Sequence, residues 1–221
     1  KSLAEQSGAD RGHVRDAELA RKRAQEHPDA EAFMTGPRLH TLEGIVRVQQ
    51  AEIEALRNAI DKTGRSIVLS LSPGATPVKM GEHVMTHANM WRITDDFWDR
   101  WGALLAMFER LDAWTPYRGA GHFPDADMLP IGMVEFNRPT HFTKNEQYTL
   151  MSLWAIGRSP LIFGGDMTNL DSFTKEMLTN PEMLKVNQQS ANNRQVSRDK
   201  NLIVWTADVP DSKDKYVALF N

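Results

Sequence analysis

Short apolar segments alternate with helical patterns through the central part of this chain, and that alternation constrains the fold more than any other feature. Apolar residues recur at helical spacing between residues 42 and 62, and the branched run at 66–71 ends in Ser72-Pro73-Gly74. A helix at 81–88, a strand at 90–93 and an amphipathic helix opened by Thr94-Asp95-Asp96 follow. Repeated strand–helix units with continuously apolar strands predict a parallel sheet covered by helices, either a barrel or a doubly wound sheet.

The second half of the chain continues this pattern and then changes it. We predict strands at 128–131 and 160–163 and helices at 143–156 and 172–178, followed by antiparallel strands at 202–205 and 216–220. The predicted domains are a polar helical or disordered segment at 1–41, a partial (β/α) barrel at 42–190 and the start of a C-terminal antiparallel β domain at 191–221. The fold class is therefore α/β.

Composition excludes several classes of function. No apolar run approaches the roughly 20 residues that cross a bilayer, so we expect no membrane span. A net charge of −3 gives no reason to expect a nucleic-acid partner, and the basic residues Arg21 to Arg23 lie beside Glu18 and Glu26, as on a solvated helix face. The absence of cysteine excludes disulfides and thiolate metal sites and leaves the cellular location open.

Carboxylates follow several of the predicted strands. Asp96 comes just after one strand, and Asp125 and Asp127 lie beside the next. Active sites of parallel α/β barrels are assembled at the carboxyl ends of the strands, so these side chains, with Ser72 and Arg92, are candidates to converge on one rim.

A structural alternative applies to some of these acids. Asp95, Asp96 and Asp99 fall in the first turn of a predicted helix, where capping alone is the more economical explanation. Asp166 follows Gly-Gly and is most simply a turn or cap residue. Asp127 has no such obvious structural role, because it precedes an apolar stretch without helical spacing.

Two histidines have a spacing that can hold zinc. His83 and His87 are four residues apart on a predicted helix, but the sequence is not His-Glu-x-x-His and no third ligand is evident. We therefore expect a surface or supporting role for them, with no metal and no cofactor.

Three motifs, in order, give the chain a family resemblance. They are Trp91-Arg-Ile-Thr-Asp-Asp96, Asp125-Ala-Asp-Met-Leu129 and Leu153-Trp-Ala-Ile-Gly-Arg-Ser-Pro-Leu161. From about residue 52 to residue 221 the chain resembles glycoside hydrolase family 27, the α-galactosidases and α-N-acetylgalactosaminidases. The resemblance implies the later half of a (β/α)₈ (TIM) barrel, followed by an antiparallel β domain. It also implies cleavage of terminal α-galactosides or related carbohydrates with retention.

The resemblance also implies roles for individual residues. Asp96 resembles the general acid/base, and Arg92 resembles a hydrogen-bond donor to the sugar hydroxyls. Asp127 and Met128 resemble part of the sugar pocket, and Ser72 stands where the family senses the substituent on sugar carbon 2. By the resemblance, a bulky acidic residue at that position accompanies galactose, whereas a small residue leaves room for an N-acetyl group. Pro73-Gly74 departs from both family patterns.

The nucleophile is the largest departure from the family pattern. Family members carry it on an earlier strand, whereas Asp10, Asp16 and Asp29 here lie in polar, helix-like surroundings. Retention needs two carboxylates roughly 5 Å apart, so half of the catalytic pair is expected to be missing. Two alternatives to an active glycosidase stay open. One is a non-catalytic sugar-binding fragment, and the other is a fragment whose open sheet edges pair with another copy as a homo-oligomer.

Overall fold

The computed structural model describes residues 42–135 and 138–221. The chain divides into two units between Ala55 and Leu56, and of the first unit the described part is residues 42–55. These residues belong to helix α3 (Leu42–Lys62), which confirms the helical period expected there. The polar helix expected within residues 1–41 and the candidate acids Asp10, Asp16 and Asp29 lie outside the described residues.

A small parallel sheet lies in the second unit, after the end of α3. In chain order the elements are β1 (Ser70–Leu71), the 3-10 turn Val78–Met80, α4 (Gly81–His87), β2 (Met90–Arg92), α5 (Trp101–Ala113), the 3-10 turn Thr115–Tyr117 and β3 (Phe123–Asp125). The strand order is β1-β2-β3, with Leu71 opposite Trp91 and Arg92 opposite Asp125. All three strands are parallel, so their carboxyl ends lie at one edge of the sheet.

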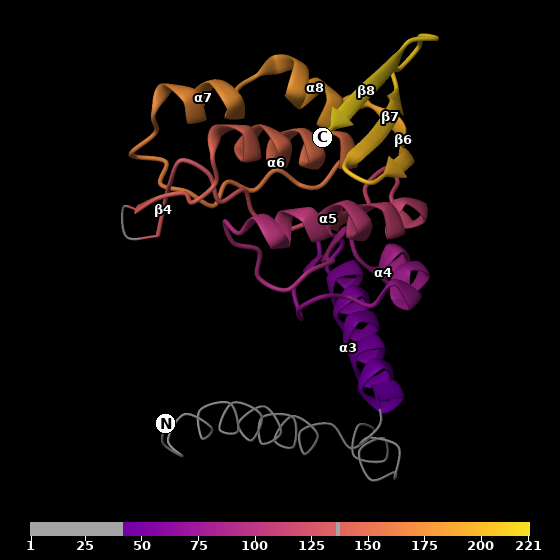
Figure 1. The fold of residues 1–221 in the computed structure, drawn as a ribbon. Helices are drawn as coiled ribbons and strands as arrows, with labels where there is room; N and C mark the ends of the chain where they lie inside the picture. The colour runs from indigo at the N-terminus through magenta and orange to yellow at the C-terminus, as the bar shows by residue number, and fades with distance from the viewer. Residues whose placement is uncertain (1–41, 136–137) are drawn as a thin grey trace. The chain divides into compact units, whose positions relative to one another are not determined.

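A short hairpin and then a helical layer follow the parallel sheet. The hairpin consists of β4 (Met133–Val134) and β5 (Arg138–Pro139). The helical layer consists of α6 (Lys144–Gly157), α7 (Ser172–Leu178) and α8 (Pro181–Gln189). Figure 1 shows α6 between α5 on one side and α8 on the other. Helix α6 is capped by Thr143, whose side chain accepts a hydrogen bond from the Glu146 amide while the Glu146 side chain accepts one from the Thr143 amide.

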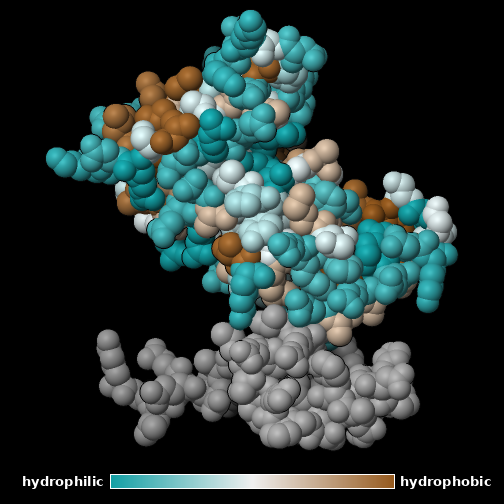
Figure 2. Space-filling model, turned by 90° about the vertical axis from the view of Figure 1, so that its right-hand side faces the viewer, coloured by the Kyte–Doolittle hydropathy of each residue, from teal (hydrophilic) through white to brown (hydrophobic). Residues whose placement is uncertain are grey.

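The C-terminal part is an antiparallel sheet of β6 (Ala191–Asp199), β7 (Leu202–Asp208) and β8 (Lys215–Phe220), which confirms the predicted pair of strands. Its inner face buries Ile203, Trp205 and Phe220, and Phe220 packs edge-on against Phe108 of α5. On its outer face Val217 and Leu219 are exposed, and Figure 2 shows hydrophobic surface gathered at the level of this sheet. The sheet is therefore amphipathic, with its inner face packed on the helical layer.

Aromatic side chains fill the interior between the parallel sheet and the helices. Trp91 of β2 and Trp114 at the end of α5 are both buried, with ring centroids 5.8 Å apart. Phe97 is buried against Trp154 of α6, at 5.0 Å between centroids, and against Phe142. Burying an aromatic side chain contributes on the order of 2 kcal/mol, so this cluster is a main source of cohesion.

Several sequence predictions need correction. The strand expected at 66–71 is paired over Ser70–Leu71 alone, and Val68 is exposed where burial on both faces was expected. The segments 128–131 and 160–163 contribute one parallel bridge, Leu129 to Phe163, in place of two strands. The sheet in the described residues is thus open and does not close into a barrel. The pattern also failed to predict β3, which carries Pro124, and α8.

None of the helices among residues 42–135 and 138–221 combines the length and apolar character that crossing a membrane would need.

Candidate active site

Arg92, the last residue of β2, lies between two carboxylates at the carboxyl edge of the parallel sheet. Its Nη2 is 2.8 Å from Oδ2 of Asp127 and 3.4 Å from Oδ1 of Asp96. The side chains of Arg92 and Asp127 are largely buried, whereas the side chain of Asp96 is 87% exposed. The structure therefore brings together three of the residues that the sequence analysis singled out.

Asp127 is held by its backbone as well as by its side chain. Its φ of 77° is in the left-handed region, which is uncommon for a residue with a side chain. Its amide donates to Oδ1 of Asp125 at 2.8 Å, and its carbonyl accepts from Nε1 of Trp154 at 2.9 Å. Its Oδ2 accepts from the Phe97 amide at 2.7 Å in addition to pairing with Arg92. A strained backbone fixed by this many contacts is typical of a functional position.

Asp96 does not belong to a helix, which corrects the capping explanation. The segment from Ile93 to Arg100 is irregular, and α5 begins only at Trp101, with Arg100 before it and no side-chain cap. Oδ1 of Asp95 instead accepts from the amide of Ala75, at 3.3 Å. The acids of this segment are thus directed to partners outside α5, and Asp96 extends into solvent beside Arg92.

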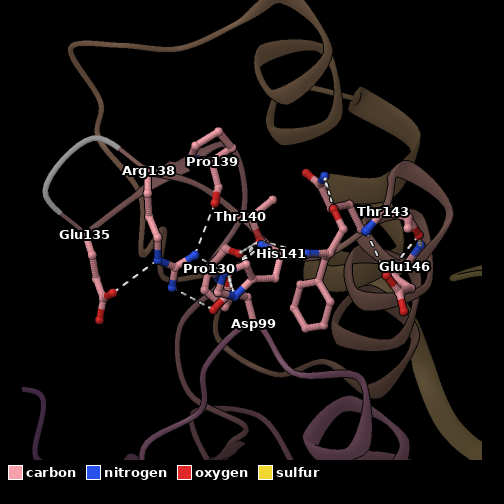
Figure 3. A network of polar contacts seen from close by, with 11 residues as sticks. Asp99, Pro130, Glu135, Arg138, Pro139, Thr140, His141, Thr143 and Glu146 are labelled. Atoms are coloured by element: carbon pink, nitrogen blue, oxygen red, sulfur yellow. Dashed lines mark hydrogen bonds and ion pairs between the residues drawn. The ribbon is translucent and has the colours of Figure 1, made fainter.

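Asp99, three residues further on, is the centre of a separate polar network (Figure 3). Its carboxylate accepts hydrogen bonds from both terminal nitrogens of Arg138, at 2.6 and 3.0 Å, and from the amide of His141, at 2.6 Å. Burial alone would raise the pKa of Asp99, but the hydrogen bonds from Arg138 and His141 and their charges outweigh it and lower the pKa to about 2. Asp99 is therefore an ionised, buried anchor.

Asp125 has the opposite electrostatic environment. It ends β3 and is buried, and this burial raises the pKa of its carboxyl despite the hydrogen bond from the Asp127 amide. The charge of Asp127 raises it further, and that of Arg92 lowers it. The two aspartates of this motif thus have different contacts. Asp125 supports the backbone of Asp127, whereas Asp127 pairs with Arg92.

Ser72 and Met128 lie on the same edge of the sheet. Ser72 is exposed and follows Leu71, the partner of Trp91, so the register places it beside Arg92. Met128 is half-buried, and a Cβ on Gly164 would lie 2.5 Å from its Sδ, so that glycine leaves the space that Met128 fills. Both residues stay predicted sugar-binding residues.

Other candidates lie elsewhere or have structural explanations. Oδ1 of Asp166 accepts from the amide and hydroxyl of Thr168, so Asp166 is the turn residue that the sequence suggested. On α4, Nδ1 of His87 lies 2.8 Å from the carbonyl of His83, and the two rings are 4.4 Å apart. That these histidines hold no metal stays a prediction.

Fold and site together define a class of protein. It is an α/β protein with an arginine between two carboxylates at the carboxyl edge of a parallel sheet, where such folds place their active sites.

Comparisons with known proteins give the family. The profile described as alpha galactosidase A matches residues 29–189, so it begins upstream of residue 52, where the sequence analysis places the start of the resemblance. Rice α-galactosidase is 32% identical over 177 residues, which cover 75% of this chain and 38% of that protein. Human α-N-acetylgalactosaminidase is 30% identical over 66% of this chain and 36% of its own length.

Among solved structures, the family 27 β-L-arabinopyranosidase of Geobacillus stearothermophilus aligns with a TM-score of 0.75 and 47% identity, over 78% of this chain and 41% of that one. A variant of that enzyme has been solved in complex with arabinose. This chain belongs to glycoside hydrolase family 27, and it spans about 40% of the length of the relatives it matches.

Sequence reasoning missed the second anchor of the segment that carries Asp96. Asp99 was noticed but interpreted as a helix cap, and Arg138 was not considered. The pair joins residues 39 positions apart, and Arg138-Pro-Thr has no local pattern that would point to Asp99. One of the three acids Asp95, Asp96 and Asp99 suffices to cap a helix. The two remaining carboxylates are the signal in the sequence that partners elsewhere in the chain exist.

Proposed function

We propose that this chain is a retaining glycosidase that removes terminal α-linked galactose-like sugars with Asp96 as its general acid/base, on the later half of a (β/α)₈ barrel followed by the start of a β domain. The observation that supports this most directly is the cluster of Asp96, Arg92 and Asp127, in which the exposed Asp96 carboxyl extends beside the arginine. Membership of family 27 gives the reaction class.

The proposed chemistry assigns one task to each group. Asp96 gives its proton to the glycosidic oxygen as the bond to the anomeric carbon breaks, and later takes a proton from the water that releases the sugar. Arg92 and Asp127 bind hydroxyls of the sugar ring, and Met128 packs on it. Retention also requires a carboxylate nucleophile. The acids upstream of residue 42 lie outside the described residues, so that partner is not assigned.

The sugar is a galactose-like pyranose, and two substrate classes compete for the site. The exposed Ser72 leaves room at sugar carbon 2, which suits galactose and N-acetylgalactosamine. A second candidate is a β-L-arabinopyranoside, because the arabinopyranosidase of Geobacillus is 47% identical over most of the chain. β-L-Arabinopyranose has the ring configuration of α-D-galactopyranose without its hydroxymethyl group, so one pocket can fit both.

Turnover of aryl glycosides tests the proposal. The full chain should release nitrophenol from the α-D-galactoside, and the ratio to the β-L-arabinopyranoside decides between the two sugars. Asp96→Asn should lower kcat/KM by about 10²–10⁴-fold, the usual contribution of general acid catalysis. Galactose binding by calorimetry without turnover would support the non-catalytic sugar-binding alternative, and neither binding nor turnover would contradict both.

A further inference from the structure

The segment that carries Asp96 is fixed on both sides of that residue. Before it, the amide of Ile93 donates to the Asp125 carbonyl at 2.9 Å, and the Ile93 carbonyl accepts from Arg110 at 3.1 Å. After it, the amide of Phe97 donates to Asp127 at 2.7 Å. Asp96 itself is exposed and has Arg92 as its ion-pair partner. Its position therefore depends on its neighbours in the chain.

Asp99 supplies a further anchor of a different kind. Its side chain is 2% exposed, and its two oxygens accept a bidentate pair of hydrogen bonds from Arg138. The His141 amide donates to Oδ2 at 2.6 Å, and the Thr140 hydroxyl lies 3.4 Å from the same oxygen. Figure 3 shows Arg138 of β5 and the residues Thr140 and His141 after it converging on Asp99. A planar guanidinium fork fixes direction as well as distance.

The donors of this anchor are themselves attached to the segment that follows Asp127. The Thr140 hydroxyl donates to the Pro130 carbonyl at 2.7 Å, and the Thr140 amide donates to the Gly132 carbonyl at 2.8 Å. Nε of Arg138 lies 3.3 Å from Glu135, which orients the guanidinium from its other side. The segment of Asp96 is thus connected twice to residues 127–141, through Asp127 and through Asp99.

We propose that Asp99, held by Arg138, is a positioning residue that sets how far the Asp96 carboxyl reaches toward the glycosidic oxygen. The inference rests on the proposed function of Asp96 and adds a role that the reaction itself does not require. Asp99 lies three positions after Asp96, so release of Asp99 lets the Asp96 backbone shift. A misplacement of about 1 Å can cost about 100-fold in rate even when its cause is remote from the chemistry.

A positioning role and a purely structural role differ in their dependence on the leaving group. Departure of 2,4-dinitrophenolate needs little protonation, whereas departure of phenolate needs the acid. A misplaced Asp96 therefore slows hydrolysis of a phenyl glycoside more than that of a dinitrophenyl glycoside. A substitution that only reduces the fraction of folded protein lowers the hydrolysis rates of both glycosides by the same factor.

The first measurement compares kcat/KM for phenyl and 2,4-dinitrophenyl α-galactosides in the full chain. Asp99→Asn should lower the phenyl value by about 10- to 100-fold and the dinitrophenyl value by less than about threefold. Arg138→Lys keeps the charge and removes the fork, so it should show the same selectivity in weaker form. Asp208→Asn is the matched control, because Asp208 is paired with Lys215 and Asn192 in the C-terminal sheet. It should leave both values unchanged.

The second measurement is backbone amide exchange, which needs no turnover. Asp99→Asn should speed exchange of the Phe97 amide and its neighbours by at least about tenfold, and Asp208→Asn should not. If Asp99→Asn fails to fold, Arg138→Lys takes its place in both measurements. Equal loss for both glycosides, or unchanged protection of Phe97, overturns the proposal. No turnover by the unmodified chain rejects the proposed function instead, and exchange then decides by itself whether Asp99 fixes the segment.

Discussion

Near the expected start of both α5 and α6 a threonine has acidic residues shortly after it, yet the two helices begin in different ways. At α6, Thr143 caps the first turn and Glu146 completes the reciprocal hydrogen bond. Before α5, Thr94-Asp95-Asp96 offers residues of the same kind, but the helix begins five residues later, at Trp101, without a side-chain cap.

The difference lies in what else the acids can bind. The carboxylates before α5 meet Arg92 of the preceding strand β2, and the Ala75 amide and Arg138 from more distant parts of the chain. A charged partner competes successfully with a free helical amide, since a cap contributes only about 1 kcal/mol. An extended segment therefore crosses the sheet edge where a first helical turn would otherwise form, and it presents Asp96 to solvent.

The largest effect on stability is expected at Asp99. Asp99→Ala removes the carboxylate and leaves the Arg138 guanidinium, one third exposed, without its main partner. We expect the free energy of unfolding to fall by about 3 kcal/mol, the lower end of the range for breaking a buried ion pair. Urea denaturation measures it. A loss of about 1 kcal/mol would instead be the value of an ordinary helix cap and would remove the contrast between the two segments.

Acid should weaken the same anchor. The pKa of Asp99 is lowered from 3.8 to about 2, so its contribution is fully present above about pH 4 and is lost as the pH falls through 2. The change amounts to about 2 kcal/mol. The difference in unfolding free energy between the unmodified chain and Asp99→Asn should shrink by that amount between about pH 4 and pH 2. A difference that does not vary with pH would show that the carboxylate is not the anchor.

A smaller effect is expected at the true cap. Thr143→Ala removes the side-chain acceptor for the Glu146 amide and should lower the free energy of unfolding by about 1 kcal/mol, without selectivity between leaving groups. Glu146→Gln keeps the reciprocal arrangement and serves as its control. Thermal melts of the two variants measure the effect. A Thr143→Ala variant that discriminated between phenyl and dinitrophenyl glycosides would connect α6 to catalysis and contradict the contrast.

The smallest effect on stability is expected at Asp96. Its side chain is 87% exposed and has one long ion-pair contact, so Asp96→Asn should change the free energy of unfolding by less than about 0.5 kcal/mol. The value of kcat/KM should nevertheless fall by about 10²–10⁴-fold, and Asp95→Asn should leave it unchanged. A clear destabilisation by Asp96→Asn would mean that the carboxylate has a structural role.

The sequence predicted elements whose signals are local. The apolar period of α3, the segments that became α4, α6 and α7, and the alternation in β7 and β8 all lie within about 20 residues. The motif around Arg92 and Asp96 and the motif of Asp127 were likewise recognisable as sequence, and the structure places those three side chains together. That these three side chains bind sugar stays a prediction.

The errors share a cause in longer-range contacts. β3 is only three residues long and contains a proline, and it exists because Met90 to Arg92 offers it a neighbouring strand. The segments 128–131 and 160–163 are apolar enough for strands, but they meet at a single bridge. The start of α5 was assigned too early because the ion pairs that hold Asp96 and Asp99 come from other elements.

The sequence by itself determined the family, the βα alternation and the identity of the candidate acid, because each is written in residues close together in the chain. Tertiary structure decided which aspartate extends toward solvent and which is buried. The guanidinium that neutralises Asp99 comes from 39 residues away, and the amide that binds Asp127 comes from 30 residues away. Charge pairing and desolvation depend on distance in space, and spacing along the chain does not contain that information.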